Sequence, residues 1–289
     1  MSGDANEKTP EFWSNSLGMR FLAVRPGTFE MGSPRTESRR FADENPRRTT
    51  LTQPFYLSKF PTTQAEWRAV VGTNPSKNRD VKRAPVERVS WIDCAGFIEK
   101  LNSDEYLLEL TTFLGPEWRY GLPTEAQWEF ACRAGTTTAY SFGATATGGE
   151  GAFGRLSAVS NDVEGGEVGE IERGGNGMNG GTGGNGGERR RVANVGDETI
   201  CEVGLFAPNP WGFCDMHGNV CEWTADRYGE YDSARTVDPT GPASGAERVA
   251  RGGSWRSPVE NCRSASRFNF LATYRGDNCG LRVGIFRLS

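Results

Sequence analysis

Short alternating stretches of apolar and polar residues dominate the N-terminal part of the chain. Residues 18–24 (GMRFLAV) and 27–33 (GTFEMGS) flank a Pro-Gly turn signal, and residues 54–60 (PFYLSKF) look like another short strand. Apolar runs of this length, bounded by Gly and Pro, predict short β-strands joined by turns. The intervening segment 34–50 carries many charges, which is typical of a surface loop.

The middle of the chain changes to a helical period. Three positions carry a helix-start signal, in which a Ser or Thr and an acidic or amide side chain three residues later cap each other: Thr63 with Glu66, Ser90 with Asp93, and Thr124 with Gln127. After Ser90 the apolar residues recur at the spacing of one helix face, and Gly135 follows the third segment as a stop signal. We therefore expect three helices.

One segment departs from both patterns. Between residues 174 and 187, nine of fourteen residues are glycine. Such a stretch cannot bury enough apolar surface to offset the entropy lost on ordering it. We expect a Gly-rich surface insertion at about 145–191 within a single domain of residues 17–289, preceded by a flexible N-terminus of residues 1–16.

Charge and size exclude several classes of partner. The 289-residue chain has a net charge of −4 at pH 7, which gives no electrostatic basis for binding nucleic acid or a membrane surface. No stretch is long and apolar enough to span a bilayer, and no signal peptide is visible. We expect a cytoplasmic monomer, with export to the cell surface left open as an alternative.

The chain contains one histidine, His217, and seven cysteines without a CxxC pair. A single histidine argues against zinc sites built from two or three histidines, and against any base–histidine relay not centred on His217. An odd number of scattered cysteines in a chain without a leader indicates reduced thiols, most of them buried apolar side chains.

Five motifs along the chain resemble one known family. They are GMRFLAVRPGTFEMGS at 18–33, LPTEAQWE at 122–129, RGGSW at 251–255, CRSA at 262–265 and GLRV at 280–283. This set resembles the formylglycine-generating enzyme (sulfatase-modifying factor) family. The resemblance implies an α+β, C-type-lectin-like fold of the formylglycine-generating-enzyme type, with short strands, about three helices and much irregular structure. The strand and turn density agrees with that fold.

The same resemblance bears on catalysis. Enzymes of this family use two cysteines, five residues apart after the Gly-Gly-Ser turn, to bind Cu(I) and activate oxygen for converting a substrate cysteine to formylglycine. This chain has Ser257 at the first position and Cys262 at the second. A hydroxyl cannot replace a soft thiolate as a Cu(I) ligand, so we expect no catalytic site. The alternative is a divergent oxidase or oxygenase that uses Cys262 with copper, together with Ser254, which also matches a family active-site position.

Two further interpretations concern this segment. Arg256 and Arg263 lie close to Cys262 in the sequence and could lower the pKa of its thiol. The run from Cys262 to Ala265 alternates as a strand would, however, which favours a buried structural cysteine. Ser257 as a nucleophile would have no candidate base other than His217.

A structural calcium site is also implied by the resemblance. Matching family members bind calcium through two side-chain oxygens and two main-chain carbonyls in the segment that corresponds to DMHGNVCEW here. The corresponding ligands are the side chains of Asp215 and Glu222 and the carbonyls of Gly218 and Val220. A second family site would begin near Asn194 and Val195, with Asp197 as a substitute ligand, but its downstream stretch is shortened and we do not expect it to bind.

The C-terminal segment 255–279 carries aromatic and charged residues where related sequences have Asn-rich loops. Aromatic side chains and arginine on surface loops favour recognition, and we expect about half of the rings to pack beneath the loop. The segment also resembles the variable proteins of diversity-generating retroelements, which bind ligands there. The expected ligand-binding residues are Trp255, Arg256, Ser257, Val259, Glu260, Ser266, Phe268, Phe270, Leu271, Tyr274, Asp277 and Asn278.

We therefore expect a non-enzymatic protein that binds a protein or peptide through these loops, on a scaffold that calcium helps to stabilise. The copper-dependent alternative predicts Cu(I) uptake that disappears when Cys262 is replaced. A third hypothesis, a regulatory or effector-associated domain of a larger system, depends on genomic context and makes no statement about residues.

Overall fold

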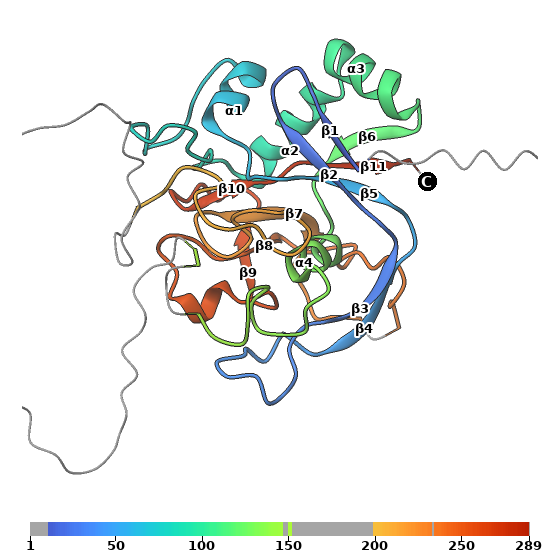
Figure 1. Ribbon diagram of the computed structural model, residues 1–289, viewed down its shortest axis with the longest axis vertical. Helices are drawn as coiled ribbons and strands as arrows, with labels where there is room; N and C mark the ends of the chain where they lie inside the picture. Colours follow the sequence, from blue (N-terminus) through green and yellow to red (C-terminus); the bar gives the residue numbers. More distant parts are fainter. Residues whose placement is uncertain (1–10, 147–149, 152–198, 233, 289) are drawn as a thin grey trace, which may run out of the picture.

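The computed structural model describes residues 11–146, 150–151, 199–232 and 234–288. Its largest sheet joins the two ends of the chain (Figure 1). The strand order is β1-β2-β5-β11-β6, formed by β1 (Phe12–Ser14), β2 (Arg20–Val24), β5 (Phe55–Ser58), β11 (Gly284–Arg287) and β6 (Trp118–Gly121).

A second sheet carries the C-terminal motifs. Its order is β10-β7-β8-β9, so β9 is an edge strand, and β10 runs parallel to β7 while the other pairs are antiparallel. A separate hairpin of β3 and β4 extends from the first sheet. These strands are β7 (Cys221–Arg227), β8 (Glu247–Arg251), β9 (Arg267–Leu271), β10 (Cys279–Leu281), β3 (Gly27–Met31) and β4 (Arg47–Leu51).

The three helices with start signals are confirmed as α1 (Gln64–Val71), α2 (Trp91–Leu101) and α4 (Glu125–Arg133), and each has the expected reciprocal cap. A fourth helix within the described residues, α3 (Asp104–Leu114), was not expected. It begins after Ser103, whose side chain makes no capping hydrogen bond. The local signal on which the prediction relied is therefore absent at this helix.

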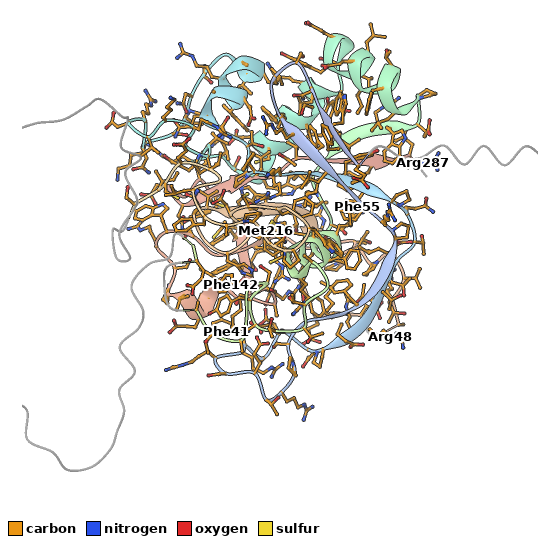
Figure 2. All side chains as sticks on the ribbon, in the orientation of Figure 1. Phe41, Arg48, Phe55, Phe142, Met216 and Arg287 are labelled. Atoms are coloured by element: carbon orange, nitrogen blue, oxygen red, sulfur yellow. The ribbon has the colours of Figure 1, made fainter. Side chains whose placement is uncertain are left out.

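The main core lies between the two sheets and the helices that cover them. Trp223 of β7, Phe97 of α2 and Tyr56 of β5 are all buried there. In Figure 2, Phe55 and Met216 lie inside the molecule, whereas Arg48 and Arg287 lie at its surface. Side chains from both ends of the chain thus share this interior.

The expectation of a flexible segment 1–16 is wrong for its last residues. Phe12–Ser14 form β1 against β2, and the Trp13 ring is buried and stacked on Phe21 at 5.7 Å. Burial of this indole holds the segment against the sheet. The polar residues around Trp13 in the sequence had suggested the opposite. Most of the Gly-rich segment 145–191, and Asn194, Val195 and Asp197, lie outside the described residues.

The expected α+β class is confirmed: short strands and helices are joined by long irregular segments. Among the described helices, none combines the length and apolar character needed to cross a membrane.

Candidate functional site

A tight turn after β8 builds the centre of the site. Gly252 and Gly253 have φ angles of 90° and 69°, which residues other than glycine rarely adopt. A Cβ atom at Gly253 would also collide with the sulfur of Cys262. The two glycines therefore let the chain bend sharply and place Ser254 directly above the buried thiol.

Ser257 is tied into this turn. Its hydroxyl lies 3.1 Å from both the backbone nitrogen and the hydroxyl of Ser254, and its own N–H donates to the Ser254 carbonyl at 2.9 Å. Ser257 is buried, with 8% of its surface exposed. Its oxygen is therefore used to hold the backbone of the turn.

Cys262 is fully buried beneath the same turn, and its sulfur lies 3.7 Å from the Pro258 carbonyl oxygen. Burial raises the pKa of this thiol well above its usual value. A thiol that stays protonated at neutral pH is a poor nucleophile and a poor metal ligand. The described residues contain no group of three or more His, Cys, Asp or Glu side chains placed to hold a metal.

The two arginines considered as activators of Cys262 are engaged elsewhere. Arg263 pairs with Glu37 and Glu44 at 2.6 Å, and Arg256 pairs with Asp277 at 2.8 Å. The expected strand at 262–265 is also wrong. A 3₁₀ turn (Val259–Cys262) is followed by residues that are buried in succession, because they fill an irregular loop interior instead of one face of a sheet.

His217 does not act on Ser257. Its Nε2 atom lies 3.0 Å from the Ser141 hydroxyl, and its Nδ1 atom lies 2.8 Å from the Cys262 carbonyl oxygen. Burial lowers the pKa of His217 to about 4, so the ring is neutral at physiological pH. This histidine joins three loop segments inside the protein.

Part of the expected ligand surface forms a polar cluster around Asp277. The Asp277 carboxylate pairs with Arg256 at 2.8 Å and with Lys77 at 3.7 Å, and its carbonyl accepts the indole N–H of Trp255 at 3.3 Å. Asn278 donates to the Ser254 hydroxyl at 3.2 Å. The cluster therefore adjoins the Ser254 turn directly.

The remaining aromatic residues form a ladder on and beyond β9. The rings of Phe270 and Tyr274 stack at 4.5 Å with 13° between their planes, and Phe268 follows at 6.4 Å from Phe270. Phe268 and Phe270 are half-buried against the main core, where Phe270 meets Trp223 edge-on. Tyr274 and Leu271 are 40% and 56% exposed. The ladder thus runs from the core to the surface.

The two parts are joined at Gly276. Tyr274 and Asn278 approach this residue so closely that a Cβ atom there would lie 2.6 Å from the oxygen of each side chain. The ladder and the polar cluster therefore form one continuous surface. Three expected members do not belong to it, because Ser257, Val259 and Ser266 are buried.

Residues 13–285 match the sulfatase-modifying factor enzyme 1-like domain family. The chain belongs to this family. It is 28% identical over 236 residues to the formylglycine-generating enzyme of Mus musculus, covering 79% of this chain and 50% of that protein. It is also 27% identical to a protein named chaperone protein LppX from Paenibacillus barcinonensis, covering 88% of this chain and 86% of that protein. The chain thus spans about half the length of the mouse enzyme.

Solved structures agree on the fold of this family member. PvdO from Pseudomonas aeruginosa superposes with a TM-score of 0.72 at 23% identity, covering 96% of this chain and 99% of PvdO. Treponema denticola variable protein 1 superposes with a TM-score of 0.71 at 22% identity, covering 97% and 100%. At this level of identity the likeness concerns the fold alone.

The residues that the family resemblance assigns to calcium differ in how they fit an ion. One carboxylate oxygen of Asp215 accepts from the Gly204 N–H at 2.7 Å, while the other is buried without a hydrogen-bond partner among the described residues. Both oxygens of Glu222 accept from Arg282, at 2.7 and 2.8 Å, and one also accepts from Trp128. Asp215 therefore fits a hard cation, whereas Glu222 already neutralises a buried guanidinium.

The turn between these carboxylates has a left-handed backbone at three of its residues. Gly218, Asp215 and Asn219 have φ angles of 98°, 58° and 63°. Burial raises the pKa of Asp215 to about 6. A bound cation would offset this cost, since it favours the charged carboxylate.

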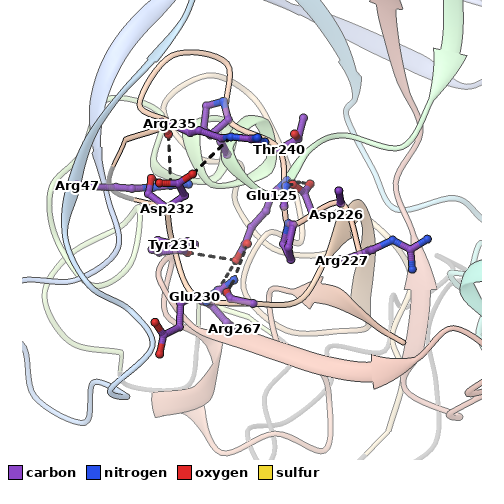
Figure 3. A pocket seen from close by; sticks show the side chains of 16 residues that line it. Arg47, Glu125, Asp226, Arg227, Glu230, Tyr231, Asp232, Arg235, Thr240 and Arg267 are labelled. Carbon is purple, nitrogen blue, oxygen red and sulfur yellow. Dashed lines mark hydrogen bonds and ion pairs between the residues drawn. The ribbon is translucent and has the colours of Figure 1, made fainter. Parts of the chain in front are cut away.

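A cavity of about 180 Å³ lies away from the expected ligand surface, beneath loop 229–243. Figure 3 shows Glu125 reaching Arg267 and Tyr231 at its floor. Two Glu125–Arg267 hydrogen bonds of 2.6 and 2.9 Å neutralise these charges, and both Asp226 oxygens accept backbone N–H groups. These side chains therefore anchor the loop to the start of α4. The sequence did not predict this arrangement, because Glu125 lies more than a hundred residues from both Asp226 and Arg267.

Proposed function

We propose that this protein is a non-enzymatic ligand-binding member of the family. Its recognition surface comprises the polar cluster around Asp277 and the Phe268–Phe270–Tyr274 ladder, and its ligand is a protein or peptide. The observation that carries the proposal is the Ser257 hydroxyl, bonded into the turn where catalytic relatives have a thiol, above a sealed Cys262. This site lacks the soft ligand pair that Cu(I) chemistry requires.

The backbone beneath the surface is held independently of its outward side chains. The Gly276 carbonyl accepts the Arg88 N–H at 2.9 Å, and the Asn278 carbonyl accepts the Cys221 N–H at 2.8 Å. The Trp255 N–H donates to the Asn219 carbonyl at 2.9 Å. Main-chain bonds of this kind let surface side chains vary without loss of the fold.

We also propose, more specifically, that the chain is the variable protein of a diversity-generating retroelement, in which the surface side chains differ between copies while the fold is kept. The superposition on Treponema denticola variable protein 1 supports it at the level of the fold. A near-copy of the segment encoding residues 255–279, placed beside a reverse transcriptase gene, would be the genomic counterpart. A neighbourhood without such a repeat would contradict this finer proposal and leave ligand binding untouched.

Peptide selection tests the binding surface directly. Immobilised full-length protein is used to select binders from a random dodecapeptide display library, and their affinities are measured by fluorescence anisotropy. Tyr274→Ala should weaken binding by about tenfold or more, as expected for a partly exposed aromatic anchor. The matched control is Phe12→Ala, a 69% exposed ring on β1, which should change nothing. Equal affinities for wild type and Tyr274→Ala would refute the proposed surface.

A structural calcium ion beside Asp215 is proposed as part of the same scaffold. The unpartnered Asp215 oxygen and the carbonyls of Gly218 and Val220 would supply ligands, with water completing the shell. Glu222 would contribute only through an oxygen that also accepts from Arg282. The ion would stiffen the turn that precedes β7 and lies behind Trp255.

A further inference from the structure

Two arginines face each other at the end of the second sheet. Arg227 of β7 and Arg248 of β8 are direct partners in the antiparallel register. Each donates to a backbone carbonyl, Arg227 to Gly245 and Arg248 to Ala225. Within the described part of the chain, no acidic side chain forms an ion pair with either of them. Like charges directly opposite each other destabilise a sheet, and no ion pair among the described residues offsets this repulsion.

The neighbouring carboxylates are already engaged. Both Asp226 oxygens accept backbone N–H groups of Glu125 and Gly241. Glu247 accepts from Asn269 at 2.8 Å. Arg227 is one of the residues that line the cavity beneath loop 229–243, and in Figure 3 its guanidinium group points away from the other labelled side chains. The two guanidinium groups therefore have no ion-pair partner within the described residues, and they are available to an anion from outside the chain.

Arg248 is positioned for such a contact. Its guanidinium lies 3.6 Å above the centre of the Trp91 ring, and its Nε atom is buried without a hydrogen-bond partner among the described residues. Burial, and then the charge of Arg227, lowers the pKa of Arg248. Stacking on an aromatic ring fixes the planar group in one orientation, and because Nη1 bonds Ala225, its second terminal nitrogen is the one left to donate to a carboxylate.

The arginine pair adjoins the aromatic ladder. Arg248 is the cross-strand partner of Phe270, the ring that stacks on Tyr274. The start of α2 borders the same region, because the Ile92 N–H donates to the Ala272 carbonyl at 3.3 Å. Ile92 is 53% exposed there. A cationic pair thus lies beside exposed apolar side chains at one end of the proposed ligand surface.

We propose that the ligand presents an acidic segment of a polypeptide, with an Asp or Glu carboxylate bound between Arg227 and Arg248 and apolar side chains packed on Tyr274 and Ile92. This inference rests on the proposed ligand-binding function and specifies the chemistry of the partner. A carboxylate accepts hydrogen bonds from guanidinium nitrogens, and its charge offsets the repulsion between the two arginines. The apolar rim makes a free inorganic anion an incomplete match.

The test compares peptides selected on wild-type protein with peptides selected on Arg227→Gln/Arg248→Gln. Sequencing both pools gives the Asp and Glu content relative to the starting library. The wild-type pool should be enriched in acidic residues and the variant pool should lose the enrichment. A selected peptide and its Glu-to-Gln counterpart should differ by about tenfold in affinity for wild type, with no difference for the variant. The matched control is Arg20→Gln, an exposed position on β2.

Several outcomes would overturn the inference. A wild-type pool without acidic enrichment, no selectable peptide, or retention of the enrichment by the double variant would each do so. If inorganic phosphate displaced the bound peptide as effectively as a soluble glutamate-rich peptide does, the arginine pair would be a general anion site instead. Loss of all binding in Tyr274→Ala without any preference for acidic peptides would uphold the proposed function and refute only the acidic ligand. Circular dichroism of each variant establishes that it is folded.

Discussion

The hydroxyl of Ser257 lies 3.1 Å from the hydroxyl of Ser254, and both are buried in the turn that follows β8. This contact gives the oxygen at position 257 a structural role in a place where catalytic relatives need a reactive sulfur. The thiol of Cys262 lies beneath the same turn, fully buried and with a raised pKa. The turn keeps the family's backbone framework without the pair of groups that carries its chemistry.

Phe270 and Tyr274 should respond differently to truncation, although their rings stack at 4.5 Å. Phe270 packs on the core through Trp223, so Phe270→Ala should lower the free energy of unfolding by about 2 kcal/mol. Tyr274→Ala, at an exposed position, should cost less than about 1 kcal/mol. Urea unfolding of both variants measures the difference. Equal losses would show that Tyr274 is a core residue.

Calcium should stabilise the protein through Asp215. Adding calcium after treatment with a chelator should raise Tm by several degrees, since an ion that binds only the folded state stabilises it. Asp215→Asn should remove this response, because it replaces the carboxylate that carries the unpartnered oxygen with a neutral amide. The exposed Asp232→Asn serves as a matched control. Calorimetry that finds the same Tm with chelator and with calcium would rule out the ion.

His217 should titrate far below an ordinary histidine. It is the only histidine of the chain, so a single ring resonance followed by NMR reports its pKa, expected at about 4. Because burial lowers the pKa in the folded state, its contribution to stability is complete above pH 6.5 and is lost as the pH falls towards 4. The slope is about 1.4 kcal/mol per pH unit. His217→Gln should abolish that slope, and a measured pKa near 6.5 would contradict the buried position.

Local sequence signals predicted the elements that depend on neighbouring residues. The reciprocal caps at Thr63, Ser90 and Thr124 placed α1, α2 and α4 correctly. Helix α3 was missed because Ser103 does not cap it. Burial in the irregular C-terminal segment follows no period, so Ser266 was taken for a surface residue although it is fully buried.

Other features of the site depend on contacts that sequence spacing cannot reveal. Arg248 of β8 is the partner of Arg227 on the adjacent strand β7. It also stacks on Trp91 of α2, more than a hundred residues earlier in the chain. Lys77 joins the Asp277 cluster in the same way. The sequence showed the aromatic and charged composition of residues 255–279, whereas the pairing of Arg227 with Arg248 could be seen only in the fold.

We propose that this chain recognises a ligand and does not carry out copper–oxygen chemistry. The most direct measurement incubates the wild-type protein with Cu(I), oxygen, reductant and a cysteine-containing peptide, and follows aldehyde formation by mass spectrometry. Ser257→Cys, which places a second thiol at the family position, is the matched comparison for Cu(I) uptake. We predict that the peptide stays unmodified with wild type and that stoichiometric Cu(I) binding appears only in Ser257→Cys. Formation of formylglycine by the wild-type protein over repeated turnovers would show that the chain is an enzyme.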